Sequence, residues 1–254
     1  MPVRDLAQLT WQEVGATDRE RTAAILPIGA LEAHGPHLPL ATDVLIAEAM
    51  ARAGAEKLSA RGMDVLLLPS LSYAPAPFAA DFPGTVTLDP AALTGQIVGI
   101  AESLARHDFD LLALANAHLD PAHLGAIHAA VSQIKKDGRI RVAYPDITQR
   151  PWAIRLTAEF KSGACHAGRY ETSIIMALRP EWVHEELRAK LPPNARSLSA
   201  AIAAGQKSFV EAGGPRAYFG SPGEATVEEG RSTIAHLGAI MEEAVMLEMV
   251  RSAG

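Results

Sequence analysis

The stretch AAILPIGALEAHGPHLPLATD, residues 23–43, contains the pattern that decides the fold. Its first part, residues 23–28, is an apolar run that ends at Gly29, which is typical of a strand in a parallel sheet. Residues 44–61 are rich in Ala, Leu, Glu and Met, which favour a helix. The polar loop between these two segments therefore follows the carboxyl end of a strand, where ligand sites of open α/β sheets form.

The same alternation of strand and helix continues along the chain. Asp89 followed by Pro90 is typical of a helix start, with the proline at the first helical position. Apolar runs predict further strands at residues 65–68, 111–115 and 140–144. Segments of helical period predict helices at residues 90–106, 121–136, 153–160, 171–178 and 227–249. Alternating elements of this kind predict an α/β fold with parallel strands joined by crossover helices. A length of 254 residues suits one such domain, so we expect a single domain over residues 1–254.

Composition excludes several classes of function. The 23 Lys and Arg residues are outnumbered by 29 Asp and Glu, so we expect no nucleic acid partner. No apolar run is long enough for a membrane helix, and the beginning of the sequence lacks the pattern of a signal peptide, so we expect a cytoplasmic protein. Because Cys165 is the only cysteine, a bound metal would need histidine and carboxylate ligands.

The loop after the first strand holds four potential metal ligands, namely Glu32, His34, His37 and Asp43. Glu32 and His34 are two residues apart, so in an extended backbone their side chains point the same way and can reach one metal or two adjacent metals. Asp43 is either a further ligand or only the N-cap of the following helix.

A second cluster follows the strand at residues 111–115 and contains Asn116, His118 and Asp120. Asp120 precedes a proline, so it is either a ligand or a helix cap. His118 has no such structural explanation and is a candidate ligand. His123 and His128 lie farther along the predicted helix, where surface or packing roles are expected.

The third cluster is CHAGRYETS, residues 165–173. His166 and Glu171 flank a turn of small residues before a predicted helix. Adjacent residues of an extended chain point to opposite faces, so Cys165 and His166 are poorly placed to act as a thiol–imidazole pair. We therefore expect Cys165 to be a small buried residue.

Together these clusters resemble the creatininase family, the creatinine amidohydrolases. The resemblance covers roughly residues 18–250, and its motifs occur in the order known for the family. The matching motifs are the loop of residues 27–43, FPGTVTL at 82–88, Asn-x-His at 116–118, HAGRYETS at 166–173, and GSPGEAT at 220–226 with Gly230 after it.

The resemblance implies a three-layer α/β/α sandwich with a mostly parallel sheet, a homohexamer and a site for two divalent metal ions. In the implied site, one metal is held by Glu32, Asp43, His118 and Asp120. The other metal is held by His34, Asp43 and Glu171, so that Asp43 bridges the pair. Histidine and carboxylate ligands suit zinc or manganese.

The implied mechanism is hydrolysis. A water between two metals loses a proton near neutral pH, and the resulting hydroxide attacks a carbonyl group polarised by one of the ions. His166 matches a catalytic histidine of the family and is the expected general acid or proton shuttle for the leaving nitrogen. His37 is expected to support the ligands or face the substrate.

Departures from the family pattern predict a small-molecule substrate other than creatinine. The chain reads NAHLDP where true creatininases have an aromatic residue and then Glu after the histidine, so Leu119 and Asp120 differ. Arg169 stands where Glu is common; it either favours a carboxylate or phosphate on the substrate or pairs with an acidic neighbour.

We therefore expect a binuclear metal-dependent amidohydrolase that acts on a small cyclic amide or a related C–N bond. One alternative is hydrolysis of another small carbonyl compound, a keto-cyclitol or a formamide, at the same metals. Another is a non-catalytic, metal-binding scaffold homologue.

Overall fold

Five parallel strands form one sheet in the computed structural model, which describes residues 3–250. The strand order is β1-β3-β2-β4-β5, and the strands are β1 (Val3–Asp5), β2 (Thr22–Ile28), β3 (Asp64–Leu67), β4 (Leu111–Asn116) and β5 (Arg141–Ala143). The register pairs Ile28 with Asn116, so the carboxyl ends of β2 and β4 lie side by side. Residues that directly follow these two strands are thereby brought together at one edge of the sheet.

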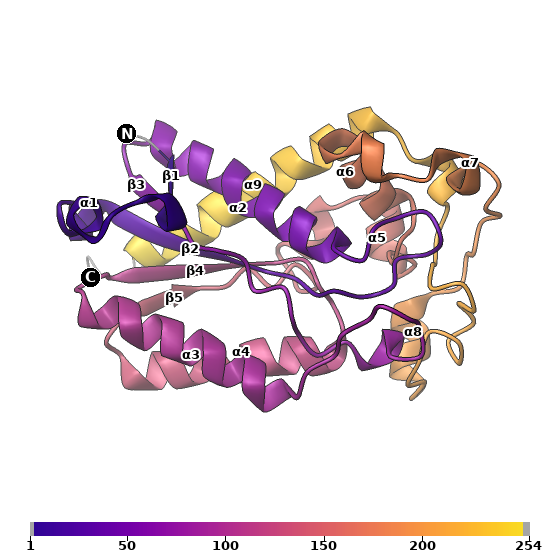
Figure 1. The fold of residues 1–254 in the computed structure, drawn as a ribbon, viewed down its shortest axis with the longest axis horizontal. Helices are drawn as coiled ribbons and strands as arrows, with labels where there is room; N and C mark the ends of the chain where they lie inside the picture. The colour runs from indigo at the N-terminus through magenta and orange to yellow at the C-terminus, as the bar shows by residue number, and fades with distance from the viewer. Residues whose placement is uncertain (1–2, 251–254) are drawn as a thin grey trace.

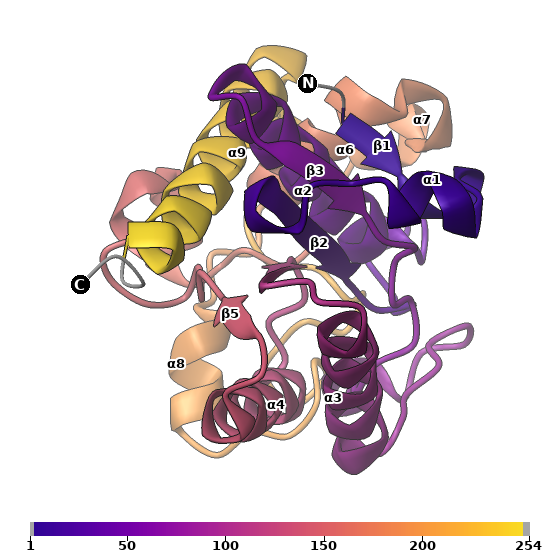
Figure 2. The ribbon, with the colours of Figure 1, turned by 90° about the vertical axis from the view of Figure 1, so that its left-hand side faces the viewer.

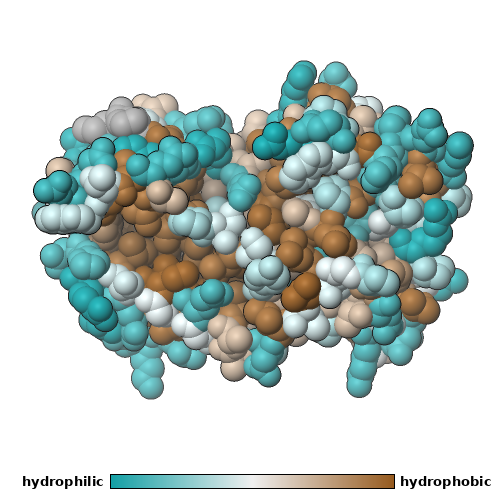
Figure 3. Space-filling model, in the orientation of Figure 1, coloured by the Kyte–Doolittle hydropathy of each residue, from teal (hydrophilic) through white to brown (hydrophobic). Residues whose placement is uncertain are grey.

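Helices cover both faces of the sheet. Side chains of β2 alternate between two cores, with Ala23 and Ile25 in one core and Ala24 and Leu26 in the other, as the two-residue repeat of a strand requires. The first core is closed by α2 (Thr42–Ala60), α6 (Arg169–Leu178) and α9 (Val227–Val250), and the second by α3 (Pro90–Arg106) and α4 (Pro121–Asp137). Figures 1 and 2 show these two helical layers on opposite sides of the sheet, and Figure 3 shows hydrophobic residues gathered in the band between them. The expected three-layer α/β fold is confirmed.

Short helices occupy the connections. They are α1 (Trp11–Gly15), α5 (Ala158–Ser162), α7 (Glu185–Arg188), α8 (Leu198–Ala203) and the 3-10 turns Leu6–Gln8, Arg19–Arg21, Pro77–Ala79, Ala153–Arg155, Pro180–Trp182 and Pro222–Glu224. Figure 1 shows α5, α7 and α8 at the end of the molecule toward which β2 and β4 run. Within residues 3–250, no helix is both long enough and apolar enough to cross a membrane.

Helix α9 packs closely against both α2 and α6. A Cβ atom added to Gly238 of α9 would lie 2.6 Å from the Cβ of Ala53 on α2, and one added to Gly230 would collide with the carbonyl oxygen of Ser173 on α6. These contacts need glycine because the helix backbones approach so closely. Both α2 and α6 carry an acidic residue in the first turn, Asp43 and Glu171, so α9 fixes the relative position of two candidate ligands.

Most predicted elements agree with the structure to within two residues, but one predicted helix is wrong and several short elements were not predicted. The helix predicted at residues 153–160 is wrong: a 3-10 turn ends at Arg155, and α5 begins only after Thr157, whose side chain caps it by accepting a hydrogen bond from the Phe160 amide. The edge strand β1 was not predicted, because three residues are too few to show a periodic pattern.

Candidate metal centre

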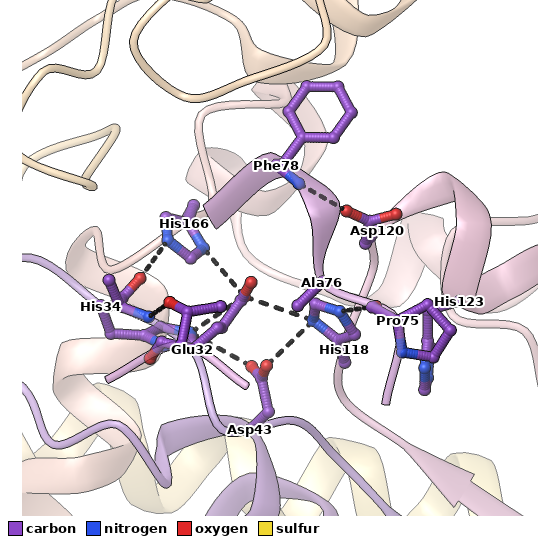
Figure 4. A network of polar contacts seen from close by, with 12 residues as sticks. Glu32, His34, Asp43, Pro75, Ala76, Phe78, His118, Asp120, His123 and His166 are labelled. Carbon is purple, nitrogen blue, oxygen red and sulfur yellow. Dashed lines mark hydrogen bonds and ion pairs between the residues drawn. The ribbon is translucent and has the colours of Figure 1, made fainter. Parts of the chain in front are cut away.

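Six of the predicted site residues come from separate segments and meet at the carboxyl edge of the sheet. Glu32 and His34 lie in the loop after β2, Asp43 lies at the start of α2, and His118 follows β4; the segment around the start of α6 supplies the remaining two, His166 and Glu171. All six side chains are buried. Figure 4 shows the histidines around the carboxylates of Glu32 and Asp43.

The loop after β2 turns back on itself because its ends touch. A Cβ atom on Gly29 would lie 2.5 Å from the backbone nitrogen of Val44, so only glycine allows the end of β2 to meet the start of α2. The amide of Glu32 donates a hydrogen bond to the carbonyl of Leu40 across the loop, at 3.1 Å. This closure brings Asp43 to the same place as Glu32.

Asp43 lies between two histidines. Its Oδ1 is 3.1 Å from Nε2 of His34, and its Oδ2 is 3.0 Å from Nδ1 of His118. His118 Nδ1 is also 3.3 Å from Oε1 of Glu32, and His34 Nε2 is 3.6 Å from Oε2 of Glu171. The two oxygens of the Asp43 carboxylate therefore face two different groups of potential ligand atoms, one around His34 and the other around His118.

Each of the three histidines is oriented by a backbone carbonyl. Nδ1 of His34 bonds the carbonyl of Glu32 at 3.1 Å, Nε2 of His118 bonds that of Pro75 at 2.8 Å, and Nε2 of His166 bonds that of Ala33 at 3.0 Å. A carbonyl can only accept, so the bonded nitrogen carries the proton. In the neutral ring the other nitrogen then directs a lone pair at the carboxylates, which is the orientation of metal-bound histidines.

The charges of the buried cluster need compensation. Burial raises the pKa of Glu171 to about 8 and also raises that of Glu32. Burial alone would lower the pKa of His34, but the carboxylates of Asp43, Glu171 and Glu32 raise it to about 10. The pKa of Asp43 is lowered despite its burial, because His34 and His118 stabilise the carboxylate. Protons or metal cations are therefore required among these carboxylates.

The donor set fits divalent metal ions. Three groups of ligand atoms each lie within 4.8 Å of one another: Glu32, Asp43 and His118; His34, Asp43 and Glu171; and Glu32, His34 and His166. Among the described residues, the buried atoms without a hydrogen bond include Glu32 Oε2, His34 Nε2 and Asp43 Oδ2, all in this cluster. Nitrogen and carboxylate donors suit zinc and manganese. The first two groups match the two expected ligand sets except for Asp120.

Asp120 lies apart from these groups. Its Oδ1 accepts a hydrogen bond from the Ala122 amide at 2.8 Å, which caps α4, and its Oδ2 accepts one from the Phe78 amide at 3.2 Å. Figure 4 shows its carboxylate directed toward Phe78. The cap role is confirmed by these contacts, and the ligand role stays a prediction.

The other histidines singled out above belong to none of these three groups of ligand atoms. Nε2 of His37 pairs with the hydroxyl of Thr172 at 2.9 Å, so His37 supports the segment that carries Glu171. His123 is buried and its Nε2 donates to Oδ1 of Asn116 at 2.7 Å, in keeping with the predicted packing role.

Two further expectations concern Arg169 and Cys165. Arg169 Nε donates to Glu229 at 2.5 Å, and Nη1 lies 3.6 Å from Glu224, so the acidic-neighbour alternative describes it. Cys165 is partly exposed and not fully buried as expected. The burial that it does have raises the pKa of its thiol, which argues against a thiolate nucleophile.

A cavity of about 450 Å³ opens above the cluster. Aromatic walls from Phe78, Phe160 and Phe209 surround it, and the ring of Phe209 lies 4.1 Å from that of His166, centroid to centroid. Two exposed cations, Arg150 and Lys161, also line it. The sequence motifs did not identify any of these residues. Only the rule that loops after parallel strands build the site could have drawn attention to the segment after β5.

Comparison with known proteins gives consistent relatives. A sequence model described as creatininase, creatinine amidohydrolase, matches residues 7–245. The creatinine amidohydrolase of Pseudomonas putida is 33% identical over 208 residues, which cover 74% of this chain and 76% of that protein. The mycofactocin precursor peptide peptidase of Mycobacterium ulcerans is 31% identical over 218 residues, covering 84% and 80% of the two chains.

Solved structures agree with the sequence comparison. A structure described as a manganese creatininase superposes with a TM-score of 0.70 at 26% identity, covering 96% of this chain and 98% of that one. A creatininase variant described as the zinc–zinc type gives a TM-score of 0.69 at the same identity and coverage. The match over residues 7–245, together with the shared fold and the buried histidine–carboxylate cluster, means that this chain belongs to the creatininase family of hydrolases.

Proposed function

We propose that the protein is a binuclear metal-dependent amidohydrolase that cleaves a small cyclic amide or a related C–N bond, other than that of creatinine. The observation that carries this proposal is the common orientation of three buried histidines. Each has one ring nitrogen bonded to a backbone carbonyl and the other directed at the same carboxylates. Relatives described as manganese and zinc–zinc creatininases support it.

The two metal sites would share Asp43. Glu32 and His118 would complete one site, and His34 and Glu171 the other, because the oxygens of Asp43 lie near Nδ1 of His118 and Nε2 of His34. Two divalent ions, when bound, lower the pKa of a shared water and polarise a carbonyl group. The carboxylates would neutralise the ions, and the carbonyl bonds would hold the histidine rings in place.

His166 would move the proton that the leaving nitrogen needs. Its Nδ1 faces the cluster, 3.7 Å from Oε1 of Glu32, while Nε2 is held by the carbonyl of Ala33. Nδ1 can therefore accept a proton from the nucleophile and return it to the departing amine. Phe209 packs on the ring and keeps its orientation.

A peptide C–N bond is the second candidate. Several relatives are mycofactocin precursor peptide peptidases, including that of Mycobacterium ulcerans. The cavity of about 450 Å³ lies within the usual range for sites that enclose drug-sized molecules, and exposed residues line part of it. A short peptide segment therefore remains compatible with its size.

Metal content tests the binuclear assignment. Elemental analysis of protein purified without chelator should give about two divalent ions per chain. His34→Ala should lose metal, whereas His128→Ala, at an exposed histidine paired with Asp146, should not. Asp120→Ala should also lose metal if Asp120 is a ligand; unchanged content would leave it as a cap. Natural protein that binds no stoichiometric metal would contradict the proposal.

A substrate panel tests the bond that is cleaved. The panel contains lactams, imides, formamides, keto-cyclitols and short peptides. Each compound is incubated with the metal-loaded protein and, for comparison, with His34→Ala. We expect metal-dependent release of an amine or of a new amino group. Hydrolysis that opens a ring without exposing nitrogen would instead favour the keto-cyclitol alternative.

A further inference from the structure

The charged residues that line the cavity are separated by sign. Its four acids are Glu32, Asp43, Asp120 and Glu171, and all of them are buried at the floor. Its two cations, Arg150 and Lys161, are exposed and thus lie at the mouth. A bound molecule that reaches the floor therefore passes positive charge at the entrance.

The cations at the mouth lack acidic partners. Neither Arg150 nor Lys161 forms an ion pair or a side-chain hydrogen bond with any residue in the range 3–250. Arg169, by contrast, is bound by Glu229, and Arg188 by Glu185. The guanidinium and ammonium groups at the mouth are consequently free to bind an anion from solution.

The backbone that carries these two side chains is held in place. Next to Arg150, the amide of Trp152 donates a hydrogen bond to the carbonyl of Gln149 at 3.0 Å. In α5, the amide of Lys161 donates a hydrogen bond to the carbonyl of Thr157 at 3.1 Å. The side chains can therefore adapt to a ligand while their attachment points stay fixed.

Apolar side chains also line the cavity. Phe160 is buried, Leu198 and Ile202 are partly buried, and Ile154 is 53% exposed. A ligand that fits this lining has a reacting group at the buried end, an anionic group at the exposed end, and an apolar portion that contacts these side chains.

We propose that Arg150 and Lys161 form an anion subsite, and that the substrate is an amide carrying a carboxylate or phosphate group separated from the C–N bond by an apolar portion. This inference rests on the proposed function only in placing the reacting bond at the floor. Arg150 offers the forked donor pattern that matches carboxylate and phosphate oxygens, and Lys161 adds a point charge.

Calorimetric titration with matched probes tests the subsite independently of turnover. The probes are 6-acetamidohexanoic acid, its neutral amide and its phosphonate analogue, titrated into protein incubated with zinc. The variants are Arg150→Gln, Lys161→Gln and the double variant, with Lys136→Gln as the control, an exposed lysine on α4 outside the cavity. Zinc content is measured in every sample.

We expect the natural protein to bind the carboxylate more tightly than the neutral amide. Each cavity variant should reduce this preference about tenfold, the usual contribution of a charge-assisted hydrogen bond. The affinity for the neutral amide should be the same in the cavity variants as in the natural protein. The Lys136→Gln variant should keep the full preference for the carboxylate. A stronger preference for the phosphonate, also lost in the double variant, would assign the subsite to phosphate rather than carboxylate.

A preference that persists in the double variant would overturn the subsite, since the anion would then be held at the floor. An equal loss in Lys136→Gln would overturn it as well, because the effect would come from overall charge. If the protein binds zinc but does not prefer the anion, this inference is contradicted and the proposed function is not. If the protein prefers the anion but does not bind zinc, the proposed function is contradicted and this inference is not.

Discussion

At the floor of the cavity, Asp43 and His118 are 1% and 2% exposed and face each other at 3.0 Å; at its mouth, Arg150 and Lys161 are exposed and unpaired among the described residues. Charges at the floor are costly unless they are compensated, so their positions are set by several partners at once. Charges at the mouth are hydrated and cost little. The difference separates a fixed region, where we propose that the chemistry takes place, from an adaptable region, where we propose that the substrate is selected.

The largest expected effect comes from breaking the floor at Asp43. Asp43→Asn keeps the shape but removes the charge that faces both His34 and His118. We expect at least one metal ion per chain to be lost and kcat/KM to fall roughly 10³-fold, because a metal contributes several kcal/mol to stabilising the transition state. Elemental analysis and steady-state kinetics measure both quantities. Unchanged metal content would contradict a bridging role.

A smaller effect is expected from the support of the floor at Asn116. Its Oδ1 accepts from Nε2 of His123 and, at 3.3 Å, from the amide of His118, and its Nδ2 donates to the carbonyl of His118. Asn116→Ala should weaken metal binding about 10- to 100-fold, as measured by competition with a chelator. Asn116→Asp keeps an acceptor at Oδ1 and should retain more affinity. Equal losses in both variants would contradict this account.

The floor should also make the metal-free protein sensitive to pH. The pKa of His34 is raised to about 10, so its stabilising contribution is complete below pH 6.5 and is lost as the pH rises toward 10. The pKa of Glu171, raised by burial to about 8, acts in the same direction. The free energy of unfolding should therefore fall between pH 6.5 and 8.5, by on the order of 1 kcal/mol per pH unit for each extra proton bound by the folded state.

Urea unfolding in the presence of a chelator measures this slope. His34→Gln should flatten it, and zinc should reverse it, because metal binding replaces protons and strengthens as the pH rises. Stability that increases over this range without metal would contradict the assigned charges.

The smallest effect is expected at Arg169, a cation outside the cavity. Its side chain is 42% exposed and pairs with Glu229 and Glu224. Arg169→Gln should change stability by no more than about 1 kcal/mol, as for other surface ion pairs, and leave anion preference unchanged. Calorimetry with the probes described above measures the preference. A loss as large as that of Arg150→Gln would remove the distinction between mouth and surface.

The floor was predictable from sequence because its residues occur in short motifs. Glu32, His34 and His118 directly follow strands whose carboxyl ends meet, and parallel strands bring such residues together. The roles of Asp43 and Asp120 could not be separated in the same way, since both precede or begin helices. The structure distinguishes them by contacts: Asp43 faces two histidines, and Asp120 bonds two backbone amides.

The mouth could not be predicted from local patterns. Arg150 and Lys161 lie in a segment where the predicted continuous helix is in fact broken at Thr157, and their neighbours in the cavity wall, Leu198 and Phe209, are far away in sequence. The motif comparison left Arg169 either as a substrate contact or as the partner of an acidic neighbour, and the structure shows it bound by two acids. Long-range packing, which leaves no periodic signal, decides which cations line the cavity.

The packing of α9 has a consequence for the order in which the protein can mature on the ribosome. Asp43 and Glu171 begin helices that α9 holds together through contacts at Gly230 and Gly238. Residues 227–250 are translated after every candidate ligand has emerged. We therefore expect a nascent chain that ends before α9 to contain the complete set of metal-binding motifs but to hold the ions weakly, so that loading is a late event in biosynthesis.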